Sequence, residues 1–401
     1  MGGDSKIEIN TEKLPMATIL KTEQKQDKLN LQFSLSGNGI PISSYNIYQN
    51  DVPIYGAGGR SINVKNTTIK ESIELVSGIN RIEISCTNLE GAEGIRATTT
   101  TYLLTPKMSD IYFLGFGVSQ YKDPRLNLNY AAKDVLDLEK VIKGLEQKNV
   151  FNVFTRVFTD AEVTPEAIKG AKEFIKKAKP QDCFILFIAG HGMHDTDASE
   201  TYYFLTSNAD LNNLKSTAAD FETIEDLMQG IPPLYKIFLM DACESGELDD
   251  EEYKTLAGFE TLSGLGIASR GFKTVGASTT LSVQGNANGS LNGAEVKRKY
   301  LYQKDRFIYN DLMRRSGAIV LSSSKGGELS YERGDFENGL FTEFLIKGLS
   351  SRIADTNGDK IISIDELRDY ILKEVANASN NLQHPTIDRD NIYQKFGFQV
   401  N

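Results

Sequence analysis

The sequence predicts a small all-β domain followed by a larger α/β domain. Residues 16–104 alternate between apolar and polar side chains at a period of two and contain no helical pattern, which is typical of antiparallel strands. From Asp110 onward, short apolar runs alternate with helical patterns, as they do in a doubly wound sheet. Two of these runs, 184–188 and 237–240, are continuously apolar, which indicates strands buried on both faces of a parallel sheet. A chain of 401 residues is long enough to form both domains.

A polar tail over 1–15 precedes the predicted β domain, which spans 16–105. Its strand-like segments are separated by turn residues and lie at 29–35, 44–48, 72–76, 81–86 and 97–104. Short strands at this spacing favour a small β-sandwich of immunoglobulin-like architecture. Such an architecture does not define a function, and the segment contains no catalytic combination of residues. We expect it to be a spacer or a docking site for a regulatory protein.

The predicted α/β domain spans 108–401, and its elements follow in a regular order. Strands are expected at 111–118, 153–158, 184–188, 237–240 and 317–321, and helices at 130–145, 164–178, 221–228, 337–349 and 364–376. Thr164 before Pro165 marks a helix start, because Thr caps the first N–H groups and Pro fits the first helical position. Residues 247–305 break the order, because they hold no clear buried strand and are rich in Gly, Ser, Asn and Thr over 262–293. We expect a flexible linker there.

Composition limits the partners and the cellular setting that we expect. The net charge of −10 argues against a nucleic-acid-binding surface. No apolar run approaches the length of a membrane span, and the first residues lack the core of a signal peptide. We therefore expect neither nucleic acid nor a membrane as a partner. Three cysteines give no disulfide framework, so we expect a cytoplasmic protein.

A His and a Cys each follow one of the continuously apolar runs. His191 lies in Gly190-His191-Gly192, and Cys243 lies within 241–246. Both therefore come just past the carboxyl end of a buried strand, where open α/β sheets build their active sites. An imidazole is the usual base for a Cys nucleophile, and the backbone N–H groups of Gly192 and Cys243 are suited to hold an oxyanion. These parts predict acyl transfer, and hence peptide hydrolysis, which needs no cofactor.

The other cysteines and histidines fit this chemistry less well. Cys86 continues an alternating strand pattern and Cys183 opens a buried run, so both are expected to be core residues. His194 is an alternative base, but it lacks the flanking glycines of His191. The His-x-x-His spacing from His191 to His194 is a weak metal signal, because further ligands at metal spacing are absent from the sequence around it.

The paired motifs resemble those of the caspase-like cysteine peptidases, and most of all the metacaspase and paracaspase branch. A strand followed by Gly-His-Gly and a second strand followed by Asp-x-Cys-x-Ser-Gly carry this resemblance, which covers about 108–400. Caspases proper usually have Gln at the position of Asp241. The resemblance implies a caspase-haemoglobinase fold, with a six-stranded, mostly parallel sheet and helices on both faces. It also implies His191 as the base and Cys243 as the nucleophile.

Acidic residues predict the preference for the residue before the cleaved bond, the P1 residue. Asp241 lies two residues before Cys243, so on a strand end it points to the same side. In the metacaspase and paracaspase branch an Asp there lines the P1 pocket, together with acids that match Asp134 and Glu328 in this chain. Converging carboxylates would select Arg or Lys. The alternative is that Asp134 and Glu328 are solvated surface charges.

The 247–305 segment lies where caspase relatives carry the linker between their two catalytic segments. A long, polar linker is a preferred place for proteolysis, and a tethered site meets it at high effective concentration. The basic residues in it that are candidates for self-cleavage are Arg270, Lys273, Lys297, Arg298 and Lys299. Cleavage there would offer a route from a zymogen to the active enzyme. The alternative is a linker that stays intact, either because it cannot reach its own active site or because an absent activator gates that site.

Residues 355–366 follow the spacing of a twelve-residue EF-hand loop. The ligand positions of such a loop would be occupied by Asp355, Asn357, Asp359, Ile361, Ser363 and Glu366. Lys360 stands where the loop normally has Gly, and a Lys enters the left-handed conformation less readily. A Ca²⁺ site and an acidic turn between two helices both stay open.

We therefore expect a cysteine endopeptidase with a Cys–His dyad that cleaves protein or peptide substrates after Arg or Lys. One alternative is the same enzyme with an acidic P1 preference. The other is an inactive, caspase-shaped interaction module.

Overall fold

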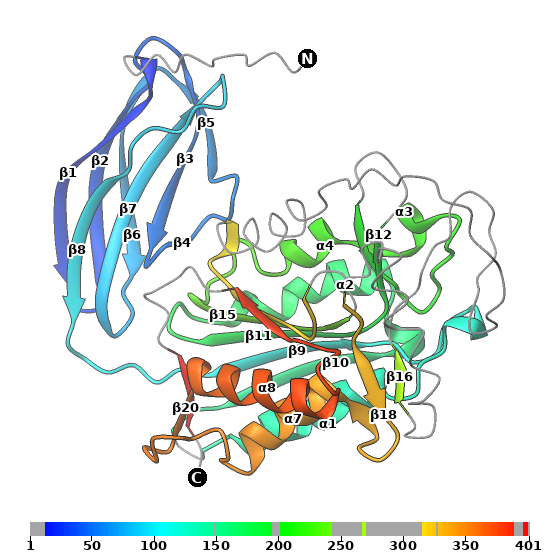
Figure 1. The fold of residues 1–401 in the computed structure, drawn as a ribbon. Coiled ribbons are helices and arrows are strands. Elements are labelled where there is room, and N and C mark those ends of the chain that lie inside the picture. The colour runs from blue at the N-terminus through cyan, green and yellow to red at the C-terminus, as the bar shows by residue number, and fades with distance from the viewer. Residues whose placement is uncertain are drawn as a thin grey trace.

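The computed structural model describes residues 13–147, 150–194, 201–242, 267–269, 315–325, 328–388 and 396–399. The chain forms a β-sandwich and a larger α/β domain, which meet at one end of the central sheet (Figure 1). Both domains were predicted. Within the described residues, none of the helices is long and apolar enough to cross a membrane.

The β-sandwich consists of two antiparallel sheets. The first has the order β1-β2-β6, with β1 at Met16–Lys25, β2 at Lys28–Ser36 and β6 at Asn66–Glu74. The second has the order β4-β3-β7-β8, and β5 pairs with β3. Its strands are β3 at Ile42–Gln49, β4 at Val52–Pro53, β5 at Arg60–Val64, β7 at Gly78–Asn88 and β8 at Ala97–Leu103.

Period-two alternation explains the core of the sandwich. Along β2 every second side chain points inward, so that Leu31 and Phe33 are at most 2% exposed. Cys86 is buried on β7 beside Ile84, which confirms its prediction as a core residue. Strand β1 was not predicted. Its second half is exposed, so main-chain pairing with β2 rather than an apolar face holds it in the sheet.

The α/β domain contains a six-stranded sheet in the order β10-β9-β11-β15-β17-β21. Its strands are β9 at Ile111–Gly117, β10 at Val153–Thr159, β11 at Cys183–Gly190, β15 at Tyr235–Ala242, β17 at Ile319–Ser322 and β21 at Thr386–Asp388. Five strands pair in parallel, and β21 runs antiparallel at one edge. Every residue of β11 is buried, as its continuous apolar run predicted.

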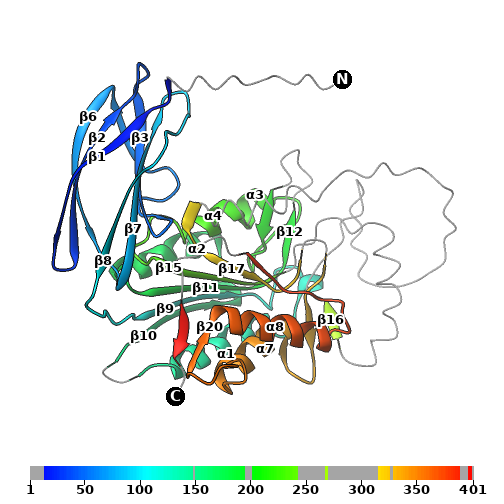
Figure 2. The ribbon, with the colours of Figure 1, turned by 60° about the vertical axis from the view of Figure 1, so that its left-hand side comes forward.

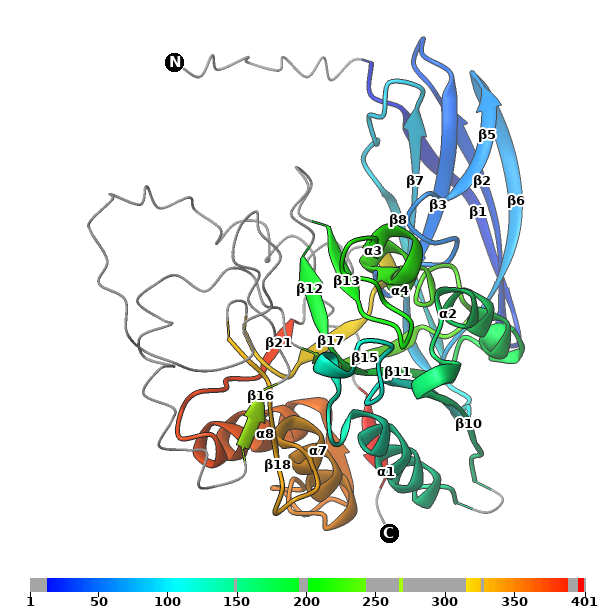
Figure 3. The ribbon, with the colours of Figure 1, turned by 90° about the vertical axis from the view of Figure 1, so that its right-hand side faces the viewer.

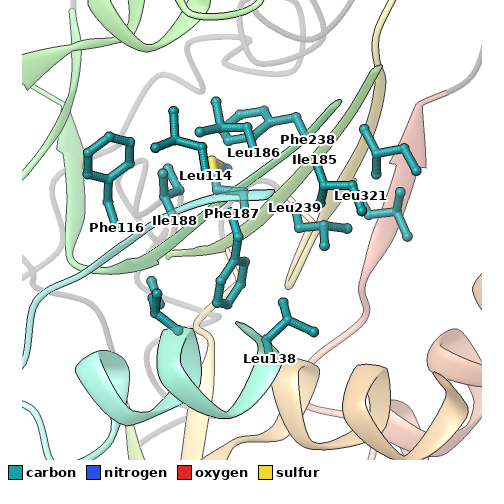
Figure 4. Packing of buried hydrophobic residues seen from close by; sticks show 14 of the residues in the cluster. Leu114, Phe116, Leu138, Ile185, Leu186, Phe187, Ile188, Phe238, Leu239 and Leu321 are labelled. Atoms are coloured by element: carbon teal, nitrogen blue, oxygen red, sulfur yellow. The ribbon is translucent and has the colours of Figure 1, made fainter. Parts of the chain in front are cut away.

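Helices cover both faces of this sheet. They are α1 at Ala131–Gly144, α2 at Pro165–Ala171, α3 at Leu214–Thr217, α4 at Phe221–Asp226, α7 at Leu340–Ser350 and α8 at Ile364–Ala378. Helices α1, α7 and α8 lie on one face and α2, α3 and α4 on the other (Figures 1 and 2). Figure 4 shows the side chains of the central strands filling the space between sheet and helices. The Thr164 hydroxyl accepts a hydrogen bond from the Ala167 N–H and Pro165 opens the helix, as predicted.

Two parts of the domain differ from the prediction. The helix expected over 164–178 is α-helical to Ala171 and continues as a 3-10 helix over Lys172–Lys177. Within the linker range, where no clear strand was expected, β16 at Ile267–Ser269 pairs with β18 at Tyr331–Arg333. A three-residue strand that pairs with one partner is too short to leave a periodic pattern.

The remaining strands form three small sheets. Strand β12 at Gly192–His194 pairs with β13 at Tyr202–Phe204, which pairs with β14 at Ala219–Asp220. Strand β18 also pairs with β19 at Asn338–Gly339, and β20 at Ile361–Ser363 pairs with β22 at Gly397–Gln399.

The β-sandwich lies beside the α/β domain (Figure 3) and contacts residues that precede β11 and β15. Val52 and Val76 of the sandwich form an apolar cluster with Leu234, which precedes β15. The Gln181 side chain, before β11, accepts a hydrogen bond from the Ser77 N–H at 2.8 Å. These contacts leave the opposite, carboxyl ends of the strands for the candidate site.

Candidate active site

The strands that precede His191 and Cys243 in the sequence are neighbours in the sheet. Strands β11 and β15 are in register up to the pair Gly190 and Ala242. His191 and Cys243 each follow this last pair in the sequence. Cys243 lies outside the described residues, as do the linker candidates Arg270, Lys273, Lys297, Arg298 and Lys299. The geometry at this end of the sheet is given below by His191 and the residues around it.

The strand order explains why a crevice forms here. The chain passes from β9 to β10 on one side and then to β11 on the other side of β9. At such a switch point the loops after the two adjacent strands diverge and leave room for a ligand. His191 follows β11, and the loop at 118–130 follows β9. Both lie at this switch point.

The His191 ring is buried and has a defined tautomer. The side chain is 3% exposed, and Nε2 lies 2.8 Å from the carbonyl oxygen of Leu126. A carbonyl oxygen accepts hydrogen bonds, so Nε2 carries the proton and donates. Nδ1 is then the ring nitrogen that can accept a proton. Leu126, at the end of the 3-10 helix η2 at Pro124–Leu126, was not predicted as a site residue.

The residues after His191 return the chain along a short hairpin. Gly192 begins β12 opposite Phe204, and the Leu205 N–H donates to the His191 carbonyl at 2.9 Å. The role of Gly192 in an oxyanion hole stays a prediction. His194 lies in the same short strand, paired with Tyr202 through the backbone.

Asp241 is fully buried at the end of β15, directly before Ala242. Its Oδ1 accepts a hydrogen bond from the Ser330 hydroxyl at 2.8 Å, and its Oδ2 accepts one from the Thr342 hydroxyl at 2.6 Å. Buried carboxylates need such donors, because an uncompensated charge in the interior is costly. The two hydroxyls fix the orientation of the carboxylate.

Asp134, like Asp241, contacts the start of α7. It is fully buried on α1, and its Oδ1 accepts a hydrogen bond from the Gly339 N–H at 3.0 Å. Gly339 is the N-cap of α7, and Thr342 is the third residue of that helix. Both carboxylates therefore meet the first turn of α7, where the helix dipole favours negative charge. Burial excludes the alternative of a solvated Asp134.

Glu328 has a different environment. Its Oε2 accepts a hydrogen bond from the His384 N–H at 2.8 Å, and its Oε1 lies 2.9 Å from His384 Nδ1 and 2.9 Å from Lys325 Nζ. Two basic side chains thus contact the carboxylate that the sequence assigned to the P1 pocket. Its side chain is 16% exposed, so it is largely covered. The assignment of Glu328 to that pocket stays a prediction.

Glu332 is a buried acid near the site that was not predicted. It is 1% exposed, and its Oε1 accepts hydrogen bonds from the N–H and the side-chain amide of Asn129 at 2.9 and 2.7 Å. It thereby satisfies donors just before α1, the helix that carries Asp134. The partners lie about two hundred residues apart in the sequence, so no local pattern could have identified them.

The other two cysteines are core thiols, as predicted. Burial raises the pKa of the Cys86 thiol to about 11. Cys183 is completely buried, which raises the pKa of its thiol well above the ordinary value. Neither forms a disulfide. Both are poor nucleophiles, because a reactive Cys must be deprotonated.

The loop at 355–366 has a left-handed residue at its sixth position. Lys360, at the position usually held by Gly, has a φ of +68° and is therefore left-handed. The carboxylates are hydrogen-bonded to the loop itself: Asp355 accepts from the Gly358 N–H at 2.8 Å, and Glu366 accepts from the Ser363 N–H at 3.0 Å. The Ser363 N–H and further donors lower the pKa of Glu366 to about 2. Across the described ranges, no group of three or more His, Cys, Asp or Glu side chains converges to hold a metal.

Comparison with known proteins identifies the family. A search of curated proteins found no match. Among solved structures, a protein of Geobacter sulfurreducens is 16% identical with a TM-score of 0.45, and covers 71% of this chain and 97% of its own. Caspase-1 from Spodoptera frugiperda is 15% identical with a TM-score of 0.42, and covers 73% of this chain and 93% of its own. The family model for the caspase domain, Peptidase C14, matches residues 114–396. The chain therefore belongs to the caspase-domain family, and its six-stranded sheet flanked by helices is the fold that the sequence predicted.

Proposed function

We propose that this chain is a cysteine endopeptidase in which His191 and Cys243 form the catalytic dyad. The observation that carries the proposal is the hydrogen bond from His191 Nε2 to the Leu126 carbonyl, which directs basicity to Nδ1. The family membership supports peptide hydrolysis, and the register of β11 and β15 supports the pairing of the two residues that follow them.

The mechanism follows from these assignments. His191 Nδ1 takes the proton from the Cys243 thiol, and the thiolate attacks the scissile carbonyl carbon. The N–H groups of Gly192 and Cys243 donate to the oxyanion of the tetrahedral intermediate. The imidazolium then donates its proton to the leaving amine, which leaves an acyl-enzyme. Water, deprotonated by His191, hydrolyses the thioester and restores the thiol. Every step uses protein groups and water.

We further propose that the P1 residue is Arg or Lys. Asp134 and Asp241 support this, because two buried carboxylates meet the first turn of α7 beside the strand that leads to Cys243. A guanidinium or an ammonium is the substrate group that such a pair attracts most strongly. An acidic P1 side chain would be repelled by both carboxylates. Glu328 contributes less negative charge to the pocket, because His384 and Lys325 contact it.

A panel of fluorogenic peptides that differ only at P1 tests the proposal. Arg and Lys substrates should be cleaved, and Asp and Gln substrates should not. Cys243→Ala should abolish cleavage, with Cys183→Ala as the control for loss of a core thiol. Preferential cleavage after Asp would refute the basic pocket. A folded wild type that cleaves no peptide of the panel would favour the interaction module.

Two regulatory proposals accompany the activity. Cleavage within 247–305 after one of the basic residues would convert the chain to a two-chain enzyme. Mass spectrometry of wild type and Cys243→Ala tests this, because self-cleavage requires the thiol. Binding of Ca²⁺ at 355–366 is supported by the left-handed Lys360, and it requires that the carboxylates exchange their backbone donors for the ion.

A further inference from the structure

We infer that Tyr121 is a positioning residue for His191, acting on both its backbone and its ring. This inference rests on the proposed Cys–His dyad and adds a residue to it. Tyr121 lies in the 118–130 loop after β9, whereas His191 follows β11. The two residues are separated by seventy positions in the sequence.

Tyr121 contacts His191 in two ways. Its hydroxyl oxygen accepts a hydrogen bond from the backbone N–H of His191 at 3.0 Å. Its ring lies against the imidazole, with ring centroids 5.2 Å apart and planes inclined by 40°. Tyr121 is 6% exposed and His191 is 3% exposed, so both contacts are shielded from water. A shielded hydrogen bond is costly to lose, because the N–H is then left without a partner.

Gly190 makes this close approach sterically feasible. It has a φ of +151°, which side-chain-bearing residues rarely adopt. A Cβ at Gly190 would lie 2.9 Å from the Tyr121 hydroxyl oxygen and 3.2 Å from the ring of Phe204. The glycine before the catalytic His is therefore explained by the space that Tyr121 occupies.

The loop that carries Tyr121 is itself fixed. The Asp160 carboxylate accepts hydrogen bonds from the N–H groups of Ser119 and Gln120 at 2.7 and 2.8 Å. The Tyr121 N–H donates to the Asn127 side chain at 2.8 Å. Leu126, whose carbonyl accepts from His191 Nε2, belongs to the same loop. The 118–130 loop thus contacts His191 at three points: its backbone N–H, its ring and its Nε2.

This arrangement has a consequence for the dyad. A Cys–His ion pair is stabilised only when the imidazole is held at hydrogen-bonding distance from the thiolate. If Tyr121 lost its hydroxyl, the His191 N–H would lose its acceptor and the ring would be less restricted. The ion pair would weaken, which raises the pKa of the thiol and lowers the pKa of the imidazolium.

The test is the pH dependence of Cys243 alkylation in the full chain. Wild type and Tyr121→Phe are treated with iodoacetamide from about pH 5 to about pH 9, and modification of each cysteine is read by mass spectrometry. Cys86 and Cys183 give little background, because burial raises the pKa of both thiols. Tyr112→Phe is the matched control, since Tyr112 is also buried on this sheet but packs on Phe154 and Phe174.

In wild type, Cys243 should react at pH values well below the ordinary thiol range. In Tyr121→Phe, the rise of Cys243 alkylation with pH should move to higher pH, because the pKa of the thiol is raised. The kcat on an Arg peptide should fall about tenfold with little change in KM. Tyr112→Phe should keep the wild-type profile. A purely structural role for Tyr121 would lower the melting temperature without moving the profile.

Two results would overturn the inference, and they differ. A depressed thiol pKa in wild type with a superimposable Tyr121→Phe profile would remove Tyr121 from the machinery and leave the dyad standing. An ordinary thiol titration of Cys243 in wild type would overturn the dyad, and this inference with it.

Discussion

The two ends of the central sheet bury polar groups in different ways. At the carboxyl end, two of the buried acids have several donors: Asp241 accepts from two hydroxyls, and Glu332 accepts from the backbone and the side chain of Asn129. At the amino end, the sheet meets the β-sandwich through an apolar cluster around Val52 and Leu234. The amino end also holds a buried acid, because Asp182 before β11 accepts hydrogen bonds from the N–H groups of Asp110 and Lys179. The difference is that the β-sandwich covers the amino end and leaves the carboxyl end to the candidate site.

Lys236 is a buried basic residue at the amino end. It is fully buried at the start of β15, and Nζ donates to the carbonyl oxygen of Ser316 at 2.9 Å. Burial, with a smaller contribution from the nearby Lys172, lowers the pKa of Lys236 to about 7. Within the described ranges, no carboxylate forms an ion pair with it. The comparison teaches that a buried charge in this sheet can be held by neutral partners. Asp241 accepts from two hydroxyl groups, and Lys236 donates to one carbonyl oxygen without an ion pair among the described residues.

The largest effect that we expect lies at the carboxyl end. His191→Ala should lower kcat/KM at least about a thousandfold, because the general base is removed. The matched control is His194→Ala, which should retain most of the activity. Steady-state kinetics on an Arg peptide measures both variants. Loss of activity in His194→Ala with survival of His191→Ala would reverse the assignment.

The acids at this end should differ from one another. Asp241→Asn should lower kcat/KM for an Arg substrate about a hundredfold or more, since a guanidinium would enter the pocket without its main counter-charge. Glu328→Gln should cost less than about tenfold, because His384 and Lys325 already contact this carboxylate. Kinetics on an Arg peptide measures both losses, and alkylation of Cys243 by iodoacetamide, which needs no P1 residue, separates P1 recognition from general damage. Equal losses for the two variants would place Glu328 in the pocket as well.

Lys236 tests the amino end by its effect on stability. Its pKa is near 7 in the folded chain and about 10.4 when unfolded, so the folded chain releases the proton first as the pH rises. Stability should therefore rise between pH 7 and pH 10, and the penalty of burying the charge is fully present below pH 7. Lys236→Met should stabilise the chain by about 2–3 kcal/mol at pH 6 and remove this part of the pH dependence. Urea denaturation at several pH values measures the free energy of unfolding and its pH dependence. If Lys236→Met left the pH dependence between pH 7 and pH 10 unchanged, the lowered pKa of Lys236 would be contradicted.

Val52 should give a smaller effect. Val52→Ala would remove apolar contacts with Leu234 and Gly317, at a cost of about 1 kcal/mol. Ile62→Ala, within the sandwich, controls for damage to that domain alone. Activity at 25 °C should be unchanged in both. Loss of activity in Val52→Ala without loss of stability would show that the docking surface communicates with the carboxyl end.

Calcium should have the smallest effect. If the loop at 355–366 binds Ca²⁺, millimolar Ca²⁺ should raise the melting temperature by a few degrees, and Asp355→Ala with Glu366→Ala should remove this shift. Mg²⁺ at the same concentration is the control, because its smaller shell fits such a loop poorly. Calorimetry without heat on addition of Ca²⁺ would leave the loop as a helix-connecting turn.

The sequence predicted those parts of the molecule that depend on local patterns. The strands that lead to His191 and Cys243 were identifiable because continuous apolar runs mark burial on both faces, as β11 shows. The register of these strands then explains why the strand ends before His191 and Cys243 lie side by side.

Backbone partners could not be predicted in the same way. The Leu126 carbonyl that fixes the His191 tautomer and the Gly339 N–H that contacts Asp134 are main-chain groups, which every residue type carries. Strand β1 was missed because its outer half is exposed and polar, so pairing rather than burial defines it. The burial of Lys236 reverses the usual expectation for a lysine, and no neighbouring residue in the sequence indicates it.

The position of β17 determines what a cut in the linker would do to the molecule. This strand lies between β15 and β21 in the sheet, and Gly317 before it contacts Val52 of the sandwich. A chain cut between Ala242 and Arg315 would therefore consist of two polypeptides that are held in one sheet by the pairing of β15 with β17. Such an enzyme would keep its architecture, but its unfolding would become a dissociation, so its melting temperature would rise with protein concentration whereas that of the uncut chain would not. The stability of the uncut chain is independent of protein concentration, whereas cleavage would make it depend on that concentration.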